Sequence, residues 1–185
     1  MDAEHQVSDE VLMAQVAQGK RERLEPLLRR YAHPLLTFIQ RMIGSRHRAE
    51  ELFQEVFLAV WHKRAQYQFP RPFKSWLFAI AVNKCREAGR SRRPTPLSLA
   101  QAEDRALAAD PSPEDRLIAT ETAVLVTAAV RQLPPQQRAV VVLRIWQNLS
   151  YDEIAQIVGR TEATVRSHMH HGLAGLRKYL EPRMA

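Results

Sequence analysis

The sequence predicts an all-α protein: two small helical domains joined by a proline-rich acidic linker, with a helix-turn-helix in the C-terminal domain. Apolar residues recur at spacings of three and four over most of the chain, which is the period of a helix. The 185 residues include only 6 glycines and few alternating strand patterns. The periodicity breaks at residues 94–115, which places the two domains at residues 1–93 and 116–185.

The N-terminal domain is expected to contain four helices. Ser8 can cap a short first helix, and Gly19 supplies a left-handed stop. The second helix is expected over about residues 21–43, with Gly44 at its end. The regular spacing of its apolar residues indicates that this helix belongs to the core.

The third helix is expected to carry two different faces. It lies within AEELFQEVFLAVWH, residues 49–62, and its apolar stripe holds Phe53, Val56, Phe57, Val60 and Trp61. The opposite stripe holds Glu51, Gln54, Glu55 and Leu58. An outward leucine among acidic residues favours a docking face, and a merely solvated face is the alternative.

The fourth helix, FKSWLFAIAVNKCREAGRSRR at residues 73–93, follows a proline-containing loop over residues 66–72. Trp76 and Cys85 fall on its apolar stripe, so we expect both side chains to be buried in the core. Its C-terminal half turns basic, with Lys84, Arg86, Arg90, Arg92 and Arg93.

Residues 94–115 are expected to form the linker. They contain four prolines, and their five acidic residues are accompanied by a single basic residue, Arg105. A solvated tether is the simplest interpretation of this composition. Helical periodicity resumes at Arg116 and continues to about Leu133, and Pro134 and Pro135 can start a further helix.

The segment that begins at Ser150 has the layout of a helix-turn-helix. Ser150 and Glu153 form a capping box that opens a short helix, which Gly159 ends, and Thr161 caps a second helix. In such motifs the second helix presents its N-terminal residues to base edges in the major groove. Its inward side is expected to be Val165, Met169, Gly172, Leu173 and Leu176, and its outward face Ala163, Arg166, Ser167 and His170.

A polyanionic partner is indicated by the charge of the chain. Lysine and arginine number 27 against 20 aspartate and glutamate residues, a formal net charge of +7, which suits nucleic acid or an acidic membrane surface. The longest apolar runs are too short to span a bilayer, and the charged N-terminus does not resemble a secretory signal. We therefore expect a cytoplasmic protein without membrane insertion, and its single cysteine fits a reducing compartment.

Three histidines, His168, His170 and His171, lie close together on the second helix of the helix-turn-helix. A zinc site needs three or four ligands, and His168 with His171 supplies only an i, i+3 pair. A general base would need a substrate pocket, and none can be identified on this exposed helix. Solvated surface residues are one remaining interpretation, and contact with DNA is the favoured one.

Residues 149–177, LSYDEIAQIVGRTEATVRSHMHHGLAGLR, resemble region four of the extracytoplasmic-function (ECF) sigma factors of bacterial RNA polymerase. Regulators of the LuxR type share part of this motif, so this segment alone leaves both families open. The sigma family is favoured because AEELFQEVFLAVW and RPFKSWLFAIAVNKCREAGRSRR resemble its region two. The resemblance implies an alternative sigma factor that binds core RNA polymerase and directs promoter recognition and transcription initiation. It also implies an anti-sigma factor as a partner, no catalytic residue of its own, and no metal or other cofactor.

The resemblance assigns roles to particular residues. The face expected to bind core polymerase consists of Glu51, Gln54, Glu55 and Leu58. The minus-ten DNA element is expected to be contacted by a loop that cradles a flipped base, Gln66, Tyr67, Gln68 and Phe69, and by Asn83, Lys84, Arg86 and Arg90. The minus-thirty-five element is expected to be read by Arg166 and Ser167, then His170 and His171, with Arg160, Thr161 and Thr164 on phosphate.

Two other hypotheses compete with this interpretation. A DNA-binding regulator could contact operators without polymerase, and a metal-dependent enzyme or sensor could be built on the three histidines. The acidic linker, by the same family resemblance, could imitate nucleic acid inside the polymerase, or serve only as a tether.

Overall fold

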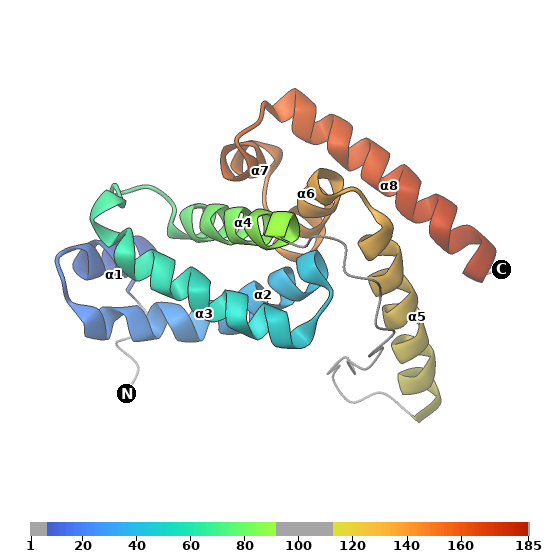
Figure 1. Ribbon diagram of the computed structural model, residues 1–185, viewed down its shortest axis with the longest axis horizontal. Helices are drawn as coiled ribbons and strands as arrows, with labels where there is room; N and C mark the ends of the chain where they lie inside the picture. Colours follow the sequence, from blue (N-terminus) through green and yellow to red (C-terminus); the bar gives the residue numbers. More distant parts are fainter. Residues whose placement is uncertain (1–6, 92–112, 185) are drawn as a thin grey trace.

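Helices make up nearly all of the structure, a computed structural model that describes residues 7–91 and 113–184. Within these ranges there is no strand, and the predicted all-α class is confirmed. Figure 1 shows α1 to α4 gathered in one half and α5 to α8 in the other, with α4 beside α7. The helices are α1 (Asp9–Ala17), α2 (Leu24–Ile43), α3 (Arg46–His62), α4 (Phe73–Ser91), α5 (Pro113–Gln132), α6 (Pro135–Trp146), α7 (Tyr151–Val158) and α8 (Glu162–Met184).

Three predicted capping residues, Ser8, Gly19 and Gly44, mark helix ends in the N-terminal half. Ser8 Oγ accepts a hydrogen bond from the backbone amide three residues on, at 3.3 Å. Gly19 follows α1 with φ of 95°, and Gly44 ends α2 with φ of 80°, values that glycine adopts without steric cost. α3 begins at Arg46, three residues before the predicted segment, because Ser45 caps it.

Aromatic side chains fill the core of the N-terminal half. Phe38 and Phe78 meet edge to face with ring centroids 5.3 Å apart, and Tyr31 meets Phe73 at 5.4 Å. Edge-to-face packing is a favoured geometry for such pairs. Trp76 is buried as well, so its predicted place in the core is confirmed. This packing fixes α4 against α2.

The C-terminal half begins earlier than the sequence predicts. α5 starts at Pro113, so the last three residues of the predicted linker, 94–115, belong to a helix. Proline is tolerated at a first helical position because its missing N–H has no partner there in any case. Residues 94–112, with the acidic side chains of Glu103, Asp104 and Asp110, lie outside the described residues, and the role of their charge stays a prediction.

The helix-turn-helix has the predicted caps. Glu153 N donates to Ser150 Oγ at 3.2 Å, Ser150 N donates to Glu153 Oε2 at 2.7 Å, and Gly159 ends α7 with φ of 66°. Val165 and Met169 are buried as expected. Leu173 is 46% exposed, so its predicted inward position is wrong.

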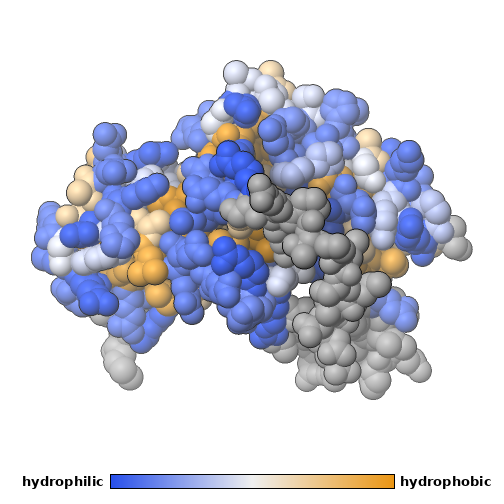
Figure 2. All heavy atoms as spheres, in the orientation of Figure 1, coloured by the Kyte–Doolittle hydropathy of each residue, from blue (hydrophilic) through white to orange (hydrophobic). Residues whose placement is uncertain are grey.

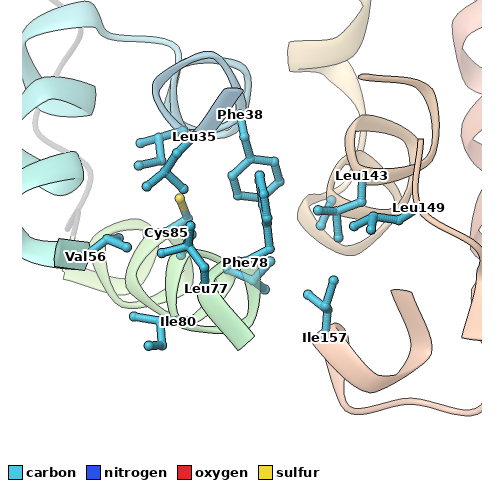
Figure 3. Packing of buried hydrophobic residues seen from close by; sticks show 14 of the residues in the cluster. Leu35, Phe38, Val56, Leu77, Phe78, Ile80, Cys85, Leu143, Leu149 and Ile157 are labelled. Carbon is cyan, nitrogen blue, oxygen red and sulfur yellow. The ribbon is translucent and has the colours of Figure 1, made fainter. Parts of the chain in front are cut away.

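The two halves pack against each other through α2 and α4 on one side and α6 and α7 on the other. Figure 3 shows Phe38 and Phe78 lying between α2 and α4 and facing the other half of the molecule. Across from them lie Leu143, Leu149 and Ile157, and all five side chains belong to one continuous cluster of buried residues. Burial of apolar area at this junction favours the closed arrangement of the two halves.

Polar side chains also bridge the junction. Gln147 is buried, and its side-chain Nε2 donates to Pro34 O at 3.2 Å. The backbone carbonyl of Gln147 accepts a hydrogen bond from Lys74 Nζ at 2.7 Å. Arg138 donates to Met42 O at 2.7 Å, where α2 ends and leaves carbonyls without a helical partner. These hydrogen bonds favour one relative placement of the two halves, because each satisfies a polar group that would be costly to bury without a partner.

Candidate nucleic-acid and protein interfaces

The N-terminal turns of α8 present a polar and cationic face. Thr161 caps this helix, since its Oγ1 accepts from the backbone amide of Thr164 at 3.3 Å. The free amides at a helix N-terminus attract anions such as phosphate. The predicted residues that are exposed here are Arg160, Thr161, Arg166, Ser167, His170 and His171, and Thr164 is half-buried.

Arg166 is exposed but held in place. Its side chain is 60% exposed, and its Nε donates to Glu162 Oε1 at 2.9 Å, one helical turn earlier. Its guanidinium also lies over the ring of Tyr151 on α7, with 4.4 Å from Cζ to the ring centroid. Neither Tyr151 nor Glu162 was among the predicted site residues, although the i, i+4 spacing of Glu162 and Arg166 is a readable signal for their ion pair.

The three histidines do not come together as ligands. His171 Nδ1 lies 2.8 Å from Ser167 O, and the rings of His170 and His171 meet edge to face at 5.6 Å. Across residues 7–91 and 113–184, no group of three or more His, Cys, Asp or Glu side chains is arranged to hold a metal ion. The geometry offers hydrogen-bonding groups for base edges on this face.

The predicted polymerase-binding residues share one face of α3. Leu58 is 58% exposed and Gln54 is exposed as well. Arg48 Nη1 lies 2.6 Å from Glu51 Oε2 and 3.3 Å from Glu55 Oε1. The hydrogen bond from Arg48 lowers the pKa of Glu51, so this carboxylate stays ionised. An exposed leucine on the same helix face as two carboxylates is the arrangement that the sequence indicated.

The predicted minus-ten residues of α4 begin beside that face. Asn83 is exposed, and Lys84 Nζ lies 3.4 Å from Glu55 Oε2 and 3.7 Å from Glu87 Oε2. A groove of about 410 Å³ runs between α3 and α4 here, lined in part by Leu58, Asn83 and Lys84. The two predicted surfaces, one for protein and one for DNA, therefore meet along this groove.

Arg86 and Arg90 lie on another side of α4, toward the C-terminal half. Arg86 donates to Val158 O at 3.4 Å, which ties it to α7. Burial lowers the pKa of Arg86, and the nearby Arg160 and Arg90 lower it further. Arg86, predicted to contact the minus-ten element, therefore lies close to Arg160, predicted to contact the minus-thirty-five element. Both arginines of α4 line a cleft of about 740 Å³ with Arg138 across from them.

Cys85 lines the same cleft, and its thiol is unreactive near neutral pH. It is buried, and burial raises the pKa of its thiol to about 12, so the reactive thiolate is scarce near neutral pH. The predicted burial of this residue is confirmed.

The loop before α4 separates its two aromatic residues. Tyr67 is 7% exposed, with its ring 5.3 Å from Trp76 and its hydroxyl donating to Arg71 O. The predicted contact of Tyr67 with a flipped base is not accessible in this conformation, because the ring belongs to the core. Phe69 is 59% exposed, and Gln66 and Gln68 are exposed beside it.

Hydrophilic residues cover most of the described surface in the view of Figure 2, with apolar patches visible between them. In the part of the chain that the structure describes, none of the helices has the length and apolar character needed to traverse a bilayer. The candidate binding surfaces are the α3 face, the exposed residues of α4, the loop that carries Phe69 and the N-terminal turns of α8.

Comparison with protein families matches both halves of the chain. Residues 27–95 match the model described as Sigma-70 region 2, and residues 123–176 match the model described as Sigma-70, region 4. The two matches occur in the order in which the sequence motifs occur. Each contains a candidate surface: region 2 holds the α3 and α4 residues, and region 4 holds the helix-turn-helix.

Curated relatives agree with the family models. The chain is 37% identical over 160 residues to ECF RNA polymerase sigma factor SigE of Mycolicibacterium smegmatis, and the match covers 84% of this chain and 61% of that relative. It is 30% identical to RNA polymerase sigma-H factor of Pseudomonas aeruginosa, over 96% of both chains. It is 32% identical to RNA polymerase sigma factor CarQ of Myxococcus xanthus, over 91% of this chain and 95% of that one.

Solved structures share the fold over most of its length. CnrH, in complex with the cytosolic domain of CnrY, superposes with a TM-score of 0.72 and 25% identity, covering 94% of this chain and 97% of that one. RpoE of Bartonella quintana superposes with a TM-score of 0.66 and 22% identity over 85% and 96%. Fold and surfaces define a two-part helical protein with a DNA-binding helix-turn-helix. The chain belongs to the sigma-70 family, in its ECF group.

Proposed function

We propose that this chain is an alternative sigma factor that binds core RNA polymerase and directs promoter recognition and transcription initiation. The observation that carries the proposal is the presence of both sigma-70 regions in one chain, each with an exposed candidate surface. A helix-turn-helix regulator that works alone would not need the acidic and apolar face of α3. In this role the chain supplies specificity and no catalysis, and it acts in the cytoplasm with the polymerase.

Each surface has a part in this function. The α3 face of Glu51, Gln54, Glu55 and Leu58 binds the polymerase, with the exposed leucine as the apolar anchor and the carboxylates as charge partners. Phe69 offers a stacking surface for an unpaired base of the minus-ten element, with Gln66 and Gln68 as its hydrogen-bonding neighbours. Asn83 reads a base, while Lys84, Arg86 and Arg90 bind phosphates.

The N-terminal turns of α8 contact the minus-thirty-five element as duplex. Arg166 and Ser167 reach base edges, and His170 and His171 hydrogen-bond beside them. Arg160, Thr161 and Thr164 contact phosphate at the helix N-terminus. Arg160 and Arg166 supply the permanent positive charge on this surface.

The closed arrangement cannot contact both promoter elements at once. Elements centred at minus ten and minus thirty-five are roughly 25 base pairs apart, which is about 85 Å of duplex at about 3.4 Å per base pair. Here α4 and α7 are in direct contact, and Arg86 is bonded to Val158. The two halves must separate before both surfaces reach a promoter, and the binding energy of the polymerase is the available source for this opening.

An anti-sigma factor is the expected regulatory partner. CnrH was solved in complex with the cytosolic domain of CnrY, and RpoE in complex with the anti-sigma factor NepR. The fold of this chain is similar to both. A partner that stabilises the closed arrangement would oppose transcription, because it would keep the two DNA surfaces together.

Reconstitution with purified core RNA polymerase tests the proposal. We expect the full chain to co-elute with core enzyme and to direct transcripts from a subset of promoters in genomic DNA, whereas core enzyme alone gives none. Failure to bind core polymerase would overturn the proposed function. Tight and sequence-specific DNA binding by the free chain at physiological salt would favour a regulator that acts without polymerase.

A further inference from the structure

Tyr151 lies between two arginines at the junction of three helices. The Cζ atom of Arg166, on α8, is 4.4 Å from the centroid of its ring, and that of Arg144, on α6, is 5.1 Å away. A guanidinium over an aromatic face is attracted by the negative charge of the π system. The tyrosine ring thus connects the exposed face of α8 to the two preceding helices.

The position of the Tyr151 ring is restrained by the start of α7 and by the residues that precede this helix. Tyr151 is the first residue of α7 and directly follows Ser150, whose capping box with Glu153 sets the start of the helix. Arg144 Nη1 donates to Leu149 O at 2.8 Å, and the Leu149 side chain is buried. The backbone on which the ring stands is therefore restrained by hydrogen bonds and by packing.

A second restraint acts on Arg166 from α8 itself. Its Nε donates to Glu162 Oε1 at 2.9 Å, and its Nη2 makes a short contact with the same oxygen. Among the described residues, Nη1 has no hydrogen-bond partner. The carboxylate thus holds one edge of the guanidinium and leaves the edge that carries Nη1 for a ligand.

We propose that Tyr151 is a positioning residue which, with Glu162, holds the Arg166 guanidinium ready for a bidentate contact with guanine. This inference rests on the proposed function, in which α8 reads the minus-thirty-five element. Arginine pairs with the O6 and N7 atoms of guanine through two N–H groups in a fixed plane. An exposed arginine otherwise loses conformational freedom on binding, and restraint before binding reduces that loss.

The expected effect is on base preference and not on overall affinity. A cation–π contact at an exposed site is worth about a two- to fivefold change in equilibrium. Loss of the ring should lower the preference for guanine at the single position that Arg166 contacts by about this factor. Phosphate contacts by Arg160 and Thr161 do not depend on the ring, so binding to unrelated duplexes should change little.

The experiment uses holoenzyme assembled from the full chain and core polymerase, and a promoter library randomised in the upstream element. Bound sequences are counted for the wild type, Tyr151→Phe, Tyr151→Leu, Glu162→Ala, Arg166→Ala and the double variant Tyr151→Leu with Arg166→Ala. We expect Arg166→Ala to abolish a guanine preference at one position. Tyr151→Leu and Glu162→Ala should weaken it, Tyr151→Phe should retain it, and Tyr151→Leu should add nothing when Arg166 is absent.

The outcomes separate this inference from the proposed function. If the wild-type holoenzyme enriches no upstream sequence, the proposed function fails and the inference falls with it. If the wild type is selective but Tyr151→Leu and Glu162→Ala both leave the guanine preference unchanged, only the positioning role is overturned. An equal loss at every position in both variants also overturns it. Glu162→Ala guards against misfolding because the Glu162 side chain is 43% exposed and its hydrogen-bonding partner is Arg166 on the same helix.

Discussion

Lys84 Nζ lies 3.4 Å from Glu55 Oε2, so an ion pair joins the proposed DNA surface of α4 to the proposed polymerase surface of α3. Both residues line the groove that also contains Leu58 and Asn83. Both side chains are partly exposed, at 30% and 37%, and ion pairs that solvent reaches contribute little to stability. The pair is therefore free to exchange for contacts with a phosphate or a protein, and binding on one surface changes the charge that the other presents.

Charge reversal on the α3 face should weaken core binding. We expect Glu51→Lys with Glu55→Lys to lower the affinity for core polymerase at least about tenfold, because like charges would face each other across the interface. The matched control is Glu22→Lys with Glu25→Lys, a charge reversal of the same size at two exposed residues outside α3. Affinity should be measured without DNA, since Glu55 also contacts Lys84. Equal losses in the α3 variant and the control would remove the assignment of this face.

Phe69 rather than Tyr67 should support promoter melting. Stacking on an aromatic ring contributes about 1–3 kcal/mol per base, so Phe69→Ala should reduce open-complex formation while Phe69→Trp preserves it. Tyr67→Phe removes a hydroxyl that donates to Arg71 O inside the fold. This variant should lower the melting temperature and leave opening intact. The measurement is permanganate reactivity of unpaired thymines, and normal opening by Phe69→Ala would remove the stacking role from Phe69.

The helices and several of their ends could be predicted because their causes are local, although α3 and α5 each start three residues earlier than expected. Ser150 and Glu153 are three residues apart, and their reciprocal hydrogen bonds follow from that spacing alone. The contact of Arg138 with Met42 O joins residues that are 96 positions apart, and no local pattern encodes it. The burial of Tyr67 could not be predicted for the same reason, because it depends on the packing of its ring against Trp76.

Core polymerase should separate the two halves. Fluorescent labels on Glu87→Cys of α4 and Gln156→Cys of α7, both exposed positions, would report the separation by energy transfer. Replacement of Cys85 by Ser removes the native thiol, which is buried and reacts slowly because burial raises its pKa to about 12. Transfer should be high in the free chain and should fall on addition of core enzyme.

The control for this measurement is promoter DNA added without polymerase. We expect little change in energy transfer, because the closed arrangement keeps Arg86 bonded to α7 and does not allow both surfaces to reach the duplex. A constant signal on addition of core enzyme would contradict the opening step. A large fall in energy transfer with promoter DNA alone would show that separation of the two halves does not require the polymerase.

Two glycines on different helices should respond in opposite directions to the same substitution. A Cβ atom at Gly172 of α8 would lie 2.6 Å from Val141 Cγ2, whereas a Cβ atom at Gly89 of α4 would meet nothing within 4 Å. Alanine is favoured over glycine in a helix by about 1 kcal/mol, and overpacking a core costs about 1–3 kcal/mol. Gly89→Ala should therefore raise the free energy of unfolding by up to about 1 kcal/mol, and Gly172→Ala should lower it by about 1 kcal/mol. Urea unfolding followed by circular dichroism measures both, and a stabilised Gly172→Ala would show that α8 does not pack this closely on α6.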